Sequence, residues 1–292
     1  MSVKCRRYKL LGDFEKVCCF LADQYNTVDF NGYLMQPFFE YAHTHPAFNH
    51  KLTHRFGIWE DNDTIIGVAC YEMDVGECLL SAKKGYEYLF NEMLLYAEKE
   101  LSALDKGKHS LRIMTTDRQN LDNILLSNGY KKIHSEPITI FPYEKGFNEK
   151  KLPDGFSVIS LDEENDFKKI NACLFKGFDH GPIPDDDIDC RMLMQSSPRF
   201  RKDLTTIIKA PNGEYACFAG MWVEQQNKYA YLEPLATVPE YRRMGLAAIA
   251  LTEAMKKSIK DGAAYCFGGT GEFYHIYGFD TVGYRDIWER LW

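Results

Sequence analysis

The sequence predicts a chain of the α+β (or α/β) class with two tandem domains, each a mixed, mostly antiparallel sheet flanked by helices. An order of strand, helix, hairpin, strand, helix, strand, short helix and strand occurs twice. Turn residues join alternating apolar runs in each half, at Asp61–Asp63 and Pro211–Gly213. The short helices end in Asn128–Tyr130 and Tyr277–Phe279, about half a chain length apart. This self-similarity indicates a tandem duplication.

The elements of each half follow from apolar periodicity and turn residues. In the first half we expect a strand over 6–11, a helix over 12–25, a hairpin over 54–73 and a helix over 86–101. In the second half we expect strands over 155–161, 229–238, 263–269 and 279–292, a hairpin over 204–224, and helices over 163–178 and 246–260. The joint is expected in the polar stretch 142–155, around residue 148, which gives domains 1–148 and 149–292.

The longest helix of the second half has clear start and stop signals. Pro239 cannot donate to a strand ladder, so the preceding strand ends there. Apolar residues recur at three- and four-residue steps from Ala248 to Ile259, lysines occupy the last turns, and Gly262 follows. A helix over 246–260 therefore starts directly after a short polar loop.

That loop carries Arg242, Arg243, Gly245 and Ala247. The N–H groups and dipole of a helix N-terminus attract anions. Gly245 allows close backbone approach, and two arginines add positive charge, so a diphosphate fits. An exposed basic turn that only caps a core helix is an equally good interpretation of these residues alone.

The stretch "VPEYRRMGLA" resembles the acyl-CoA-binding motif of the GNAT acyltransferase superfamily, Arg/Gln-x-x-Gly-x-Gly/Ala, which here reads Arg242-x-x-Gly245-x-Ala247. A strand precedes the motif, and a long helix and another strand follow it. The later stretch "EFYHIYGF" resembles the family's Tyr-x-x-x-Gly-Phe. The element order over about residues 150–292 matches that fold throughout.

The resemblance implies acetyl-CoA as co-substrate and no metal. It also implies a bulge that opens the sheet, for which Pro234 is the expected place. The backbone of residues 235–237 would run beside the pantetheine arm, and the N–H groups of residues 243–247 would hold the pyrophosphate. The expected cofactor-binding residues are Leu235, Ala236, Thr237, Arg242, Arg243, Met244, Gly245, Leu246 and Ala247.

Two side chains are candidates for proton transfer. Tyr274 falls where the family often places a general acid, and a phenol there would protonate the departing thiolate. The alternative is that Tyr274 only packs against the cofactor. Glu233, just before the acyl-binding segment, is the candidate base, since partial burial raises a carboxylate's pKa. The alternative is an ordinary strand carboxylate.

The first half departs from the motif. Its corresponding loop, "SAKKGYEYLF", has one glycine, no arginine, and the bulky Tyr86 and Tyr88. Leu125 stands four residues before Gly129, where Tyr274 would correspond. We expect a degenerate domain that does not bind CoA. In the second half, only one long strand follows Gly278, so part of the sheet edge is expected from the other half or another chain.

Three further stretches have two interpretations each. One stretch contains four histidines, His43, His45, His50 and His54. It could form a metal site, but a polar loop is the favoured interpretation. Four aspartates admit an attractor for a cationic amine or a solvated acidic turn: Asp185, Asp186, Asp187 and Asp189. The glycine-rich "FGGTGE" lacks a lysine, so it predicts a flexible turn at the mouth of the CoA channel and no separate phosphate loop.

Composition narrows the function classes. Charged residues make up 26% and the formal net charge is −7, which argues against nucleic-acid binding and is compatible with a cationic substrate. No apolar run predicts a membrane span, and the N-terminus lacks the apolar core of a signal peptide. The nine scattered cysteines favour reduced thiols in a cytoplasmic protein.

Together these patterns predict an N-acetyltransferase that transfers an acetyl group from acetyl-CoA to the primary amine of a small molecule by direct attack in a ternary complex. One alternative is a non-catalytic acyl-CoA-binding sensor or regulatory protein, and a purely structural protein is another. The acceptor, the acyl-chain length and the oligomeric state stay open, and a homodimer is compatible with the sequence.

Overall fold

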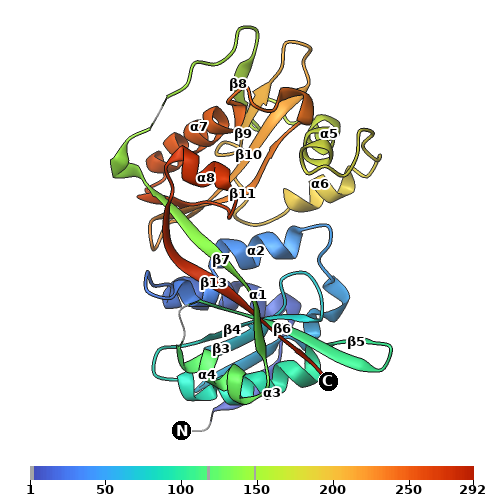
Figure 1. The fold of residues 1–292 in the computed structure, drawn as a ribbon, viewed down its shortest axis with the longest axis vertical. Helices are drawn as coiled ribbons and strands as arrows, with labels where there is room; N and C mark the ends of the chain where they lie inside the picture. Colours follow the sequence, from blue (N-terminus) through green and yellow to red (C-terminus); the bar gives the residue numbers. More distant parts are fainter. Residues whose placement is uncertain (1–2, 117–118, 148) are drawn as a thin grey trace. The chain divides into compact units, whose positions relative to one another are not determined.

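The computed structural model describes residues 3–116, 119–147 and 149–292 (Figure 1). The chain divides into two compact units. Unit 1 consists of residues 1–138 and 281–292, and unit 2 of residues 139–280. The predicted class, two tandem mixed sheets flanked by helices, is confirmed.

Unit 1 has a seven-strand path in the order β1-β2-β3-β4-β6-β13-β7, with β5 beside β6. The β4–β6 pair is parallel, whereas the β1–β2, β2–β3, β3–β4 and β6–β13 pairs are antiparallel. Its strands are β1 (Lys4–Arg7), β2 (Gly57–Asp61), β3 (Thr64–Cys70), β4 (Glu77–Ala82), β5 (Ala103–Asp105), β6 (Lys108–Thr116) and most of β7 (Lys131–Pro142) and β13 (Asp280–Leu291). Its helices and 3-10 turns are α1 (Leu10–Gln24), η1 (Phe30–Tyr33), α2 (Gln36–Thr44), η2 (His50–Arg55), η3 (Glu87–Leu89), α3 (Phe90–Glu100) and α4 (Gln119–Ser127).

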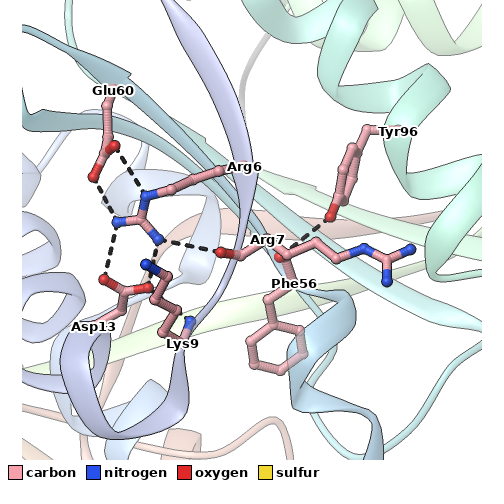
Figure 2. A network of polar contacts seen from close by, with 7 residues as sticks. All are labelled: Arg6, Arg7, Lys9, Asp13, Phe56, Glu60 and Tyr96. Carbon is pink, nitrogen blue, oxygen red and sulfur yellow. Dashed lines mark hydrogen bonds and ion pairs between the residues drawn. The ribbon is translucent and has the colours of Figure 1, made fainter.

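An ionic network fixes the start of unit 1 (Figure 2). The Arg6 guanidinium donates to both carboxylate oxygens of Glu60 on β2, at 2.9 and 2.5 Å, and to those of Asp13 on α1, at 2.6 and 2.9 Å. Asp13 also accepts the Lys9 N–H at 2.7 Å. Burial alone would raise the pKa of Asp13, but the bonds from Arg6 and Lys9 outweigh it and lower that pKa. The network therefore holds β1, β2 and the first turn of α1 together.

Unit 2 contains strands in the order β7-β12-β11-β10-β9-β8, all antiparallel except the β11–β12 pair. Its strands are β8 (Ser157–Ser160), β9 (Thr206–Lys209), β10 (Tyr215–Glu224), β11 (Tyr229–Thr237) and β12 (Tyr265–Phe267), with the end of β7. Its helices and 3-10 turns are η4 (Tyr143–Lys145), α5 (Phe167–Gly177), α6 (Asp189–Met194), η5 (Pro239–Tyr241), α7 (Leu246–Lys260) and α8 (Glu272–Tyr277).

Two apolar clusters cover the faces of the unit 2 sheet. One joins α7, through residues such as Leu251 and Met255, to β10 and β11. The other joins α5, through Ile170 and Leu174, to Phe218 of β10. Figure 1 shows α5 and α7 on opposite sides of these strands. The central strands are therefore covered on both faces.

Each half of the sequence contributes a strand segment to the unit formed mainly by the other half. Residues 140–142 of β7, from the first half, pair with β12 of unit 2, and residues 285–291 of β13, from the second half, pair with β6 of unit 1. The expected domain boundary between residues 148 and 149 therefore differs from the boundaries of the compact units, at 138/139 and 280/281. Residue 148 itself lies outside the described residues. The expectation that part of the second sheet comes from the other half is confirmed.

The hairpin turns lie where the sequence places them. Asn62 and Asp63 join β2 to β3 with φ values of 50° and 62°, and Gly213 lies between β9 and β10 with φ 86°. Two successive residues with positive φ suit a two-residue hairpin. The nine cysteines are free thiols, and most are buried. None of the helices in the described part of the chain is both long and apolar enough to cross a bilayer.

Candidate active site

The C-terminal end of β11, residues 235–237, has an open edge. Tyr229–Tyr231 pair with β12, which ends at Phe267, whereas residues 235–237 pair only with β10 among the described strands. The Val238 N–H donates to Ala216 of β10 at 3.0 Å. Because backbone groups alternate in an antiparallel pair, those of Leu235 and Thr237 face away from β10. A ligand with amide groups has a strand edge to join there.

A bulge produces this opening. Met221 pairs with Leu232 and Ala219 with Leu235, so Glu233 and Pro234 together oppose Gly220. The predicted bulge at Pro234 is confirmed. A Cβ on Gly220 would lie 2.4 Å from the Glu233 carbonyl oxygen, so only glycine fits here. The Trp222 indole donates to the same oxygen at 3.0 Å, which fixes the bulge from the opposite strand.

The loop after β11 turns into a helix with open donors. Arg243 and Gly245 have φ values of 64° and 81°, and α7 begins at Leu246. The backbone N–H groups from Arg243 to Ala247 donate to no group among the residues that the structure describes. Several unpaired donors at the start of a 15-residue helix form an anion-binding arrangement.

A cleft of about 590 Å³ lies along this strand end and loop. It is lined by eight of the nine predicted cofactor-binding residues: Leu235, Ala236, Thr237, Arg242, Arg243, Gly245, Leu246 and Ala247. Met244 does not line it, and its side chain is 42% exposed. The cleft is also lined by residues that were not predicted: Lys150, Gly177, Tyr241, Ala248, Phe273, Ile276 and Tyr277. Tyr241 and Ala248 lie beside the loop motif, and Phe273, Ile276 and Tyr277 lie within the stretch "EFYHIYGF", so the sequence held a signal for these five.

Arg242 bonds to protein groups. Its guanidinium donates to the carbonyls of Thr237 at 3.1 Å and Gly177 at 2.9 Å, and pairs with the Asp179 carboxylate at 2.9 Å. These bonds tie the end of α5 to the β11–α7 loop. Arg243 has no ion-pair partner in the described residues. The two arginines, equivalent in the sequence analysis, are therefore placed differently.

Tyr274 lies on α8 beside the turn that follows β12. Its ring packs against Gly268 and Gly269, and a Cβ on Gly269 would lie 3.1 Å from the phenol oxygen. It also contacts Phe279, with ring centroids 5.3 Å apart. Tyr274 is half-buried and does not line the cleft. The turn predicted from "FGGTGE" thus packs against the ring of Tyr274.

Tyr277, one turn further along α8, lines the cleft. Its hydroxyl lies 2.6 Å from the Thr252 hydroxyl of α7. Burial raises the pKa of Tyr277, so its phenol is protonated at neutral pH. The hydroxyl is thus engaged with α7, while the ring forms part of the cleft wall.

Glu233 lies at the bulge, partly exposed, and does not line the cleft. Its backbone carbonyl is fixed by Trp222. The bulge places Glu233 at the point where β11 leaves β12, next to the open edge. This is a suitable place for a group that would take a proton from a substrate beside that edge.

In the corresponding loop of unit 1, three successive N–H groups bond within the protein. The Gly85 N–H donates to the Glu87 carboxylate at 2.8 Å, and the Lys84 N–H to the side-chain oxygen of Gln24 at 3.3 Å. The Tyr86 N–H donates to the Lys83 carbonyl at 2.8 Å. A carboxylate of the protein thus accepts from this loop, whereas the loop of unit 2 has open donors.

A segment of unit 1 also occupies the space between its diverging strands. β4 pairs with β6 only over Glu77–Leu79. Beyond that point the Ser81 hydroxyl donates to the buried Asn31 side chain at 2.7 Å. On the other side, the Thr116 hydroxyl donates to the Asp29 carbonyl. The η1 segment thus bonds to both strands where unit 2 has its open edge.

Residues of the histidine-rich and aspartate-rich stretches form hydrogen bonds within the protein. His43 is buried on α2, where its Nδ1 lies 2.8 Å from the Phe39 carbonyl, so the expected polar loop is wrong for this residue. Burial lowers the pKa of His43 to about 4. Asp185 accepts a bond from Asn171 at 3.1 Å. The described residues contain no group of three or more metal-binding side chains.

Comparisons with known proteins agree with this geometry. The model of the acetyltransferase (GNAT) family matches residues 168–278. A GCN5-related N-acetyltransferase from Sphaerobacter thermophilus is similar in structure, with a TM-score of 0.64, 10% identity, and 99% of this chain and 95% of that chain covered. A tandem GNAT protein from the clavulanic acid biosynthesis pathway has a TM-score of 0.65, 9% identity, and coverage of 99% and 98%.

FemX is also similar, with a TM-score of 0.60, 12% identity, and coverage of 97% of this chain and 96% of that chain. At these identities the structural likeness shows the fold alone. The search of curated proteins returned no match. Residues 168–278 thus match the acetyltransferase (GNAT) family model, and over its whole length the chain has a fold similar to that of tandem GNAT proteins.

Proposed function

We propose that unit 2 binds acetyl-CoA and transfers its acetyl group to the primary amine of a small molecule. The cleft between the open edge of β11 and the start of α7 carries this proposal. Acyl-CoA binding is a property of the GNAT family. The open donors fit the pyrophosphate of such a ligand, and the open strand edge fits its pantetheine arm.

The cofactor-binding roles follow from the exposed backbone groups. The amides of the pantetheine arm would add to β11 at the backbone groups of Leu235 and at the Thr237 N–H, as a further strand does, while the Thr237 carbonyl keeps its bond from Arg242. The N–H groups from Arg243 to Ala247 would hold the pyrophosphate, with Arg243 supplying positive charge. Arg242 acts indirectly, because its bonds to Thr237 and Gly177 fix the loop that presents these donors.

The reaction needs two proton transfers around one substitution. The amine nitrogen attacks the thioester carbonyl, so a C–N bond forms as the C–S bond breaks. Glu233 accepts one proton of the ammonium, directly or through water. Tyr274 donates a proton to the departing thiolate sulfur and is reprotonated by the second proton that the nitrogen loses. No covalent enzyme intermediate is required, because an amine attacks a thioester directly. Positioning of the two substrates then supplies most of the rate enhancement.

We propose that unit 1 does not bind the cofactor. Glu87 and Gln24 accept bonds from its loop donors, and η1 bonds to both diverging strands. A phosphate would have to displace the Glu87 carboxylate, and a pantetheine arm would have to displace Asn31. The unit then contributes a folded support for the active half.

Calorimetric titration of acetyl-CoA into the whole chain tests the proposal. One site per chain is expected, and it should be lost in an Arg243→Ala/Gly245→Trp variant, because the indole fills the loop and the charge is removed. An amine screen that follows thiol release then tests transfer. Two sites would refute the degeneracy of unit 1. Binding without transfer to any amine would favour a sensor, and no binding would refute the acyltransferase proposal.

Replacement of Tyr274 by phenylalanine is expected to lower kcat by about 10²-fold or more, because the thiolate loses its general acid. Acetyl-CoA affinity should change little, since the substitution removes only the phenol oxygen and keeps the ring. Steady-state kinetics with calorimetry separates the two effects.

Tyr277→Phe is the matched control. It removes a phenol from the same helix whose hydroxyl lies 2.6 Å from Thr252, and kcat is expected to stay within a few-fold of wild type. An unchanged kcat in Tyr274→Phe would remove the acid role. The reverse pattern between the two variants would transfer that role to Tyr277.

A further inference from the structure

A lysine outside the loop motif lies over the start of α7. Lys150 belongs to the connection between η4 and β8, and it lines the same cleft as Arg243 and Gly245. Its Cδ and Nζ atoms lie 3.4 and 4.0 Å from the position that a Cβ on Gly245 would take. The side chain therefore reaches the loop whose backbone N–H groups are open.

Three other basic residues nearby are already paired, whereas Arg243 has no partner in the part of the chain that the structure describes. Arg242 pairs with Asp179 at 2.9 Å, Lys256 with Glu149 at 2.7 Å, and Lys151 with Asp154 at 3.6 Å. Within the described residues, Lys150 has no ion-pair partner. Its ammonium is exposed and stands beside open donors that already favour an anion. A cation in that position is complementary to a phosphate ligand.

We propose that the Lys150 ammonium binds the pyrophosphate of the bound cofactor. It supplies positive charge to this ligand, whereas the charge of Arg242 is paired with Asp179 within the protein. This inference rests on the function proposed above for unit 2. It makes Lys150 a cofactor-binding residue contributed by the connection between the two sequence halves, separate from the Arg-x-x-Gly-x-Ala motif. Since the contact is with a phosphate, its contribution falls as ionic strength rises.

Calorimetry with CoA and with 3′-dephospho-CoA tests this assignment at low and at high salt. Lys150→Ala is expected to weaken both ligands about tenfold at low salt, because one charge-assisted contact is lost. The difference from wild type should shrink at high salt. Lys151→Ala is the matched control, since it removes an adjacent exposed lysine outside the cleft, and its affinity should match wild type.

Each other outcome overturns the proposal in a recognisable way. Unchanged affinity in Lys150→Ala, or an equal loss in Lys151→Ala, would exclude a specific contact. A loss confined to CoA would place Lys150 on the 3′-phosphate and refute the pyrophosphate assignment. Failure of the wild-type chain to bind CoA would instead refute the proposed function, which distinguishes the two failures.

Discussion

A chain divided between residues 148 and 149 is expected to yield a C-terminal fragment without a stable fold. The fragment lacks residues 140–142, which pair with β12. It also lacks Phe141, which is 4% exposed and packs against Phe279 with centroids 5.4 Å apart. Loss of a buried phenylalanine alone costs about 3–5 kcal/mol, a large part of the about 5–15 kcal/mol that stabilises a domain.

The N-terminal fragment should also lack a stable fold, because it too loses a partner strand. It lacks residues 285–291, which pair with β6, and the buried Trp288, whose indole donates to Thr115 at 3.2 Å. Circular dichroism during thermal unfolding of each fragment measures this. Co-expression of the two fragments should restore a cooperative transition, because each supplies the other's strand.

A longer fragment, residues 139–292, is the matched control for the C-terminal half. It differs only by the ten residues that include the partner strand of β12, and it should be clearly more stable than the 149–292 fragment. Cooperative unfolding and acetyl-CoA binding by the shorter fragment alone would contradict the structural role assigned to this exchange.

Gly220→Ala is expected to destabilise unit 2 by about 3 kcal/mol, as an overpacked core site does, and to weaken acetyl-CoA binding. The added methyl would lie 2.4 Å from the Glu233 carbonyl oxygen and 3.0 Å from Pro234 Cδ. Backbone atoms must therefore move, and the bulge that opens β11 changes shape. Thermal unfolding measures the stability change, and calorimetry measures the binding change.

Gly271→Ala is the control for this substitution. It makes the same chemical change at a glycine with no atom within 4 Å of the added Cβ. Its unfolding temperature should stay close to that of the wild type. If both variants behaved alike, the requirement for glycine opposite the bulge would be wrong.

The sequence determined the elements whose signals are local. The α7 bounds, Leu246–Lys260, match the expected range, because a periodic apolar face, a preceding loop and a following glycine all agree. The turn at Asn62–Asp63 was also predicted, since residues with permissive backbones fix such turns within a few positions. The bulge at Pro234 was expected from the resemblance to the GNAT family and is present. The loop motif likewise indicated most of the cleft lining.

Interactions between residues distant in sequence were decided by the tertiary structure. The exchange of β7 and β13 depends on which sheet edges are unpaired once both units fold, and no local pattern encodes that choice. His43 is buried because aromatic residues surround it, including Phe39 and Phe48 with centroids 4.3 and 4.6 Å away. The expected loop was inferred from polarity alone, which does not report such packing.

The same distinction holds at the candidate site. The sequence alone determined the residue types that a phosphate-binding loop needs and the helix that presents them, because these lie within ten consecutive residues. Only the tertiary structure decided that Arg242 bonds to Gly177 and Asp179 while Lys150 reaches the loop. A long flexible side chain pairs with whatever charge the fold brings near, so its partner depends on three-dimensional proximity.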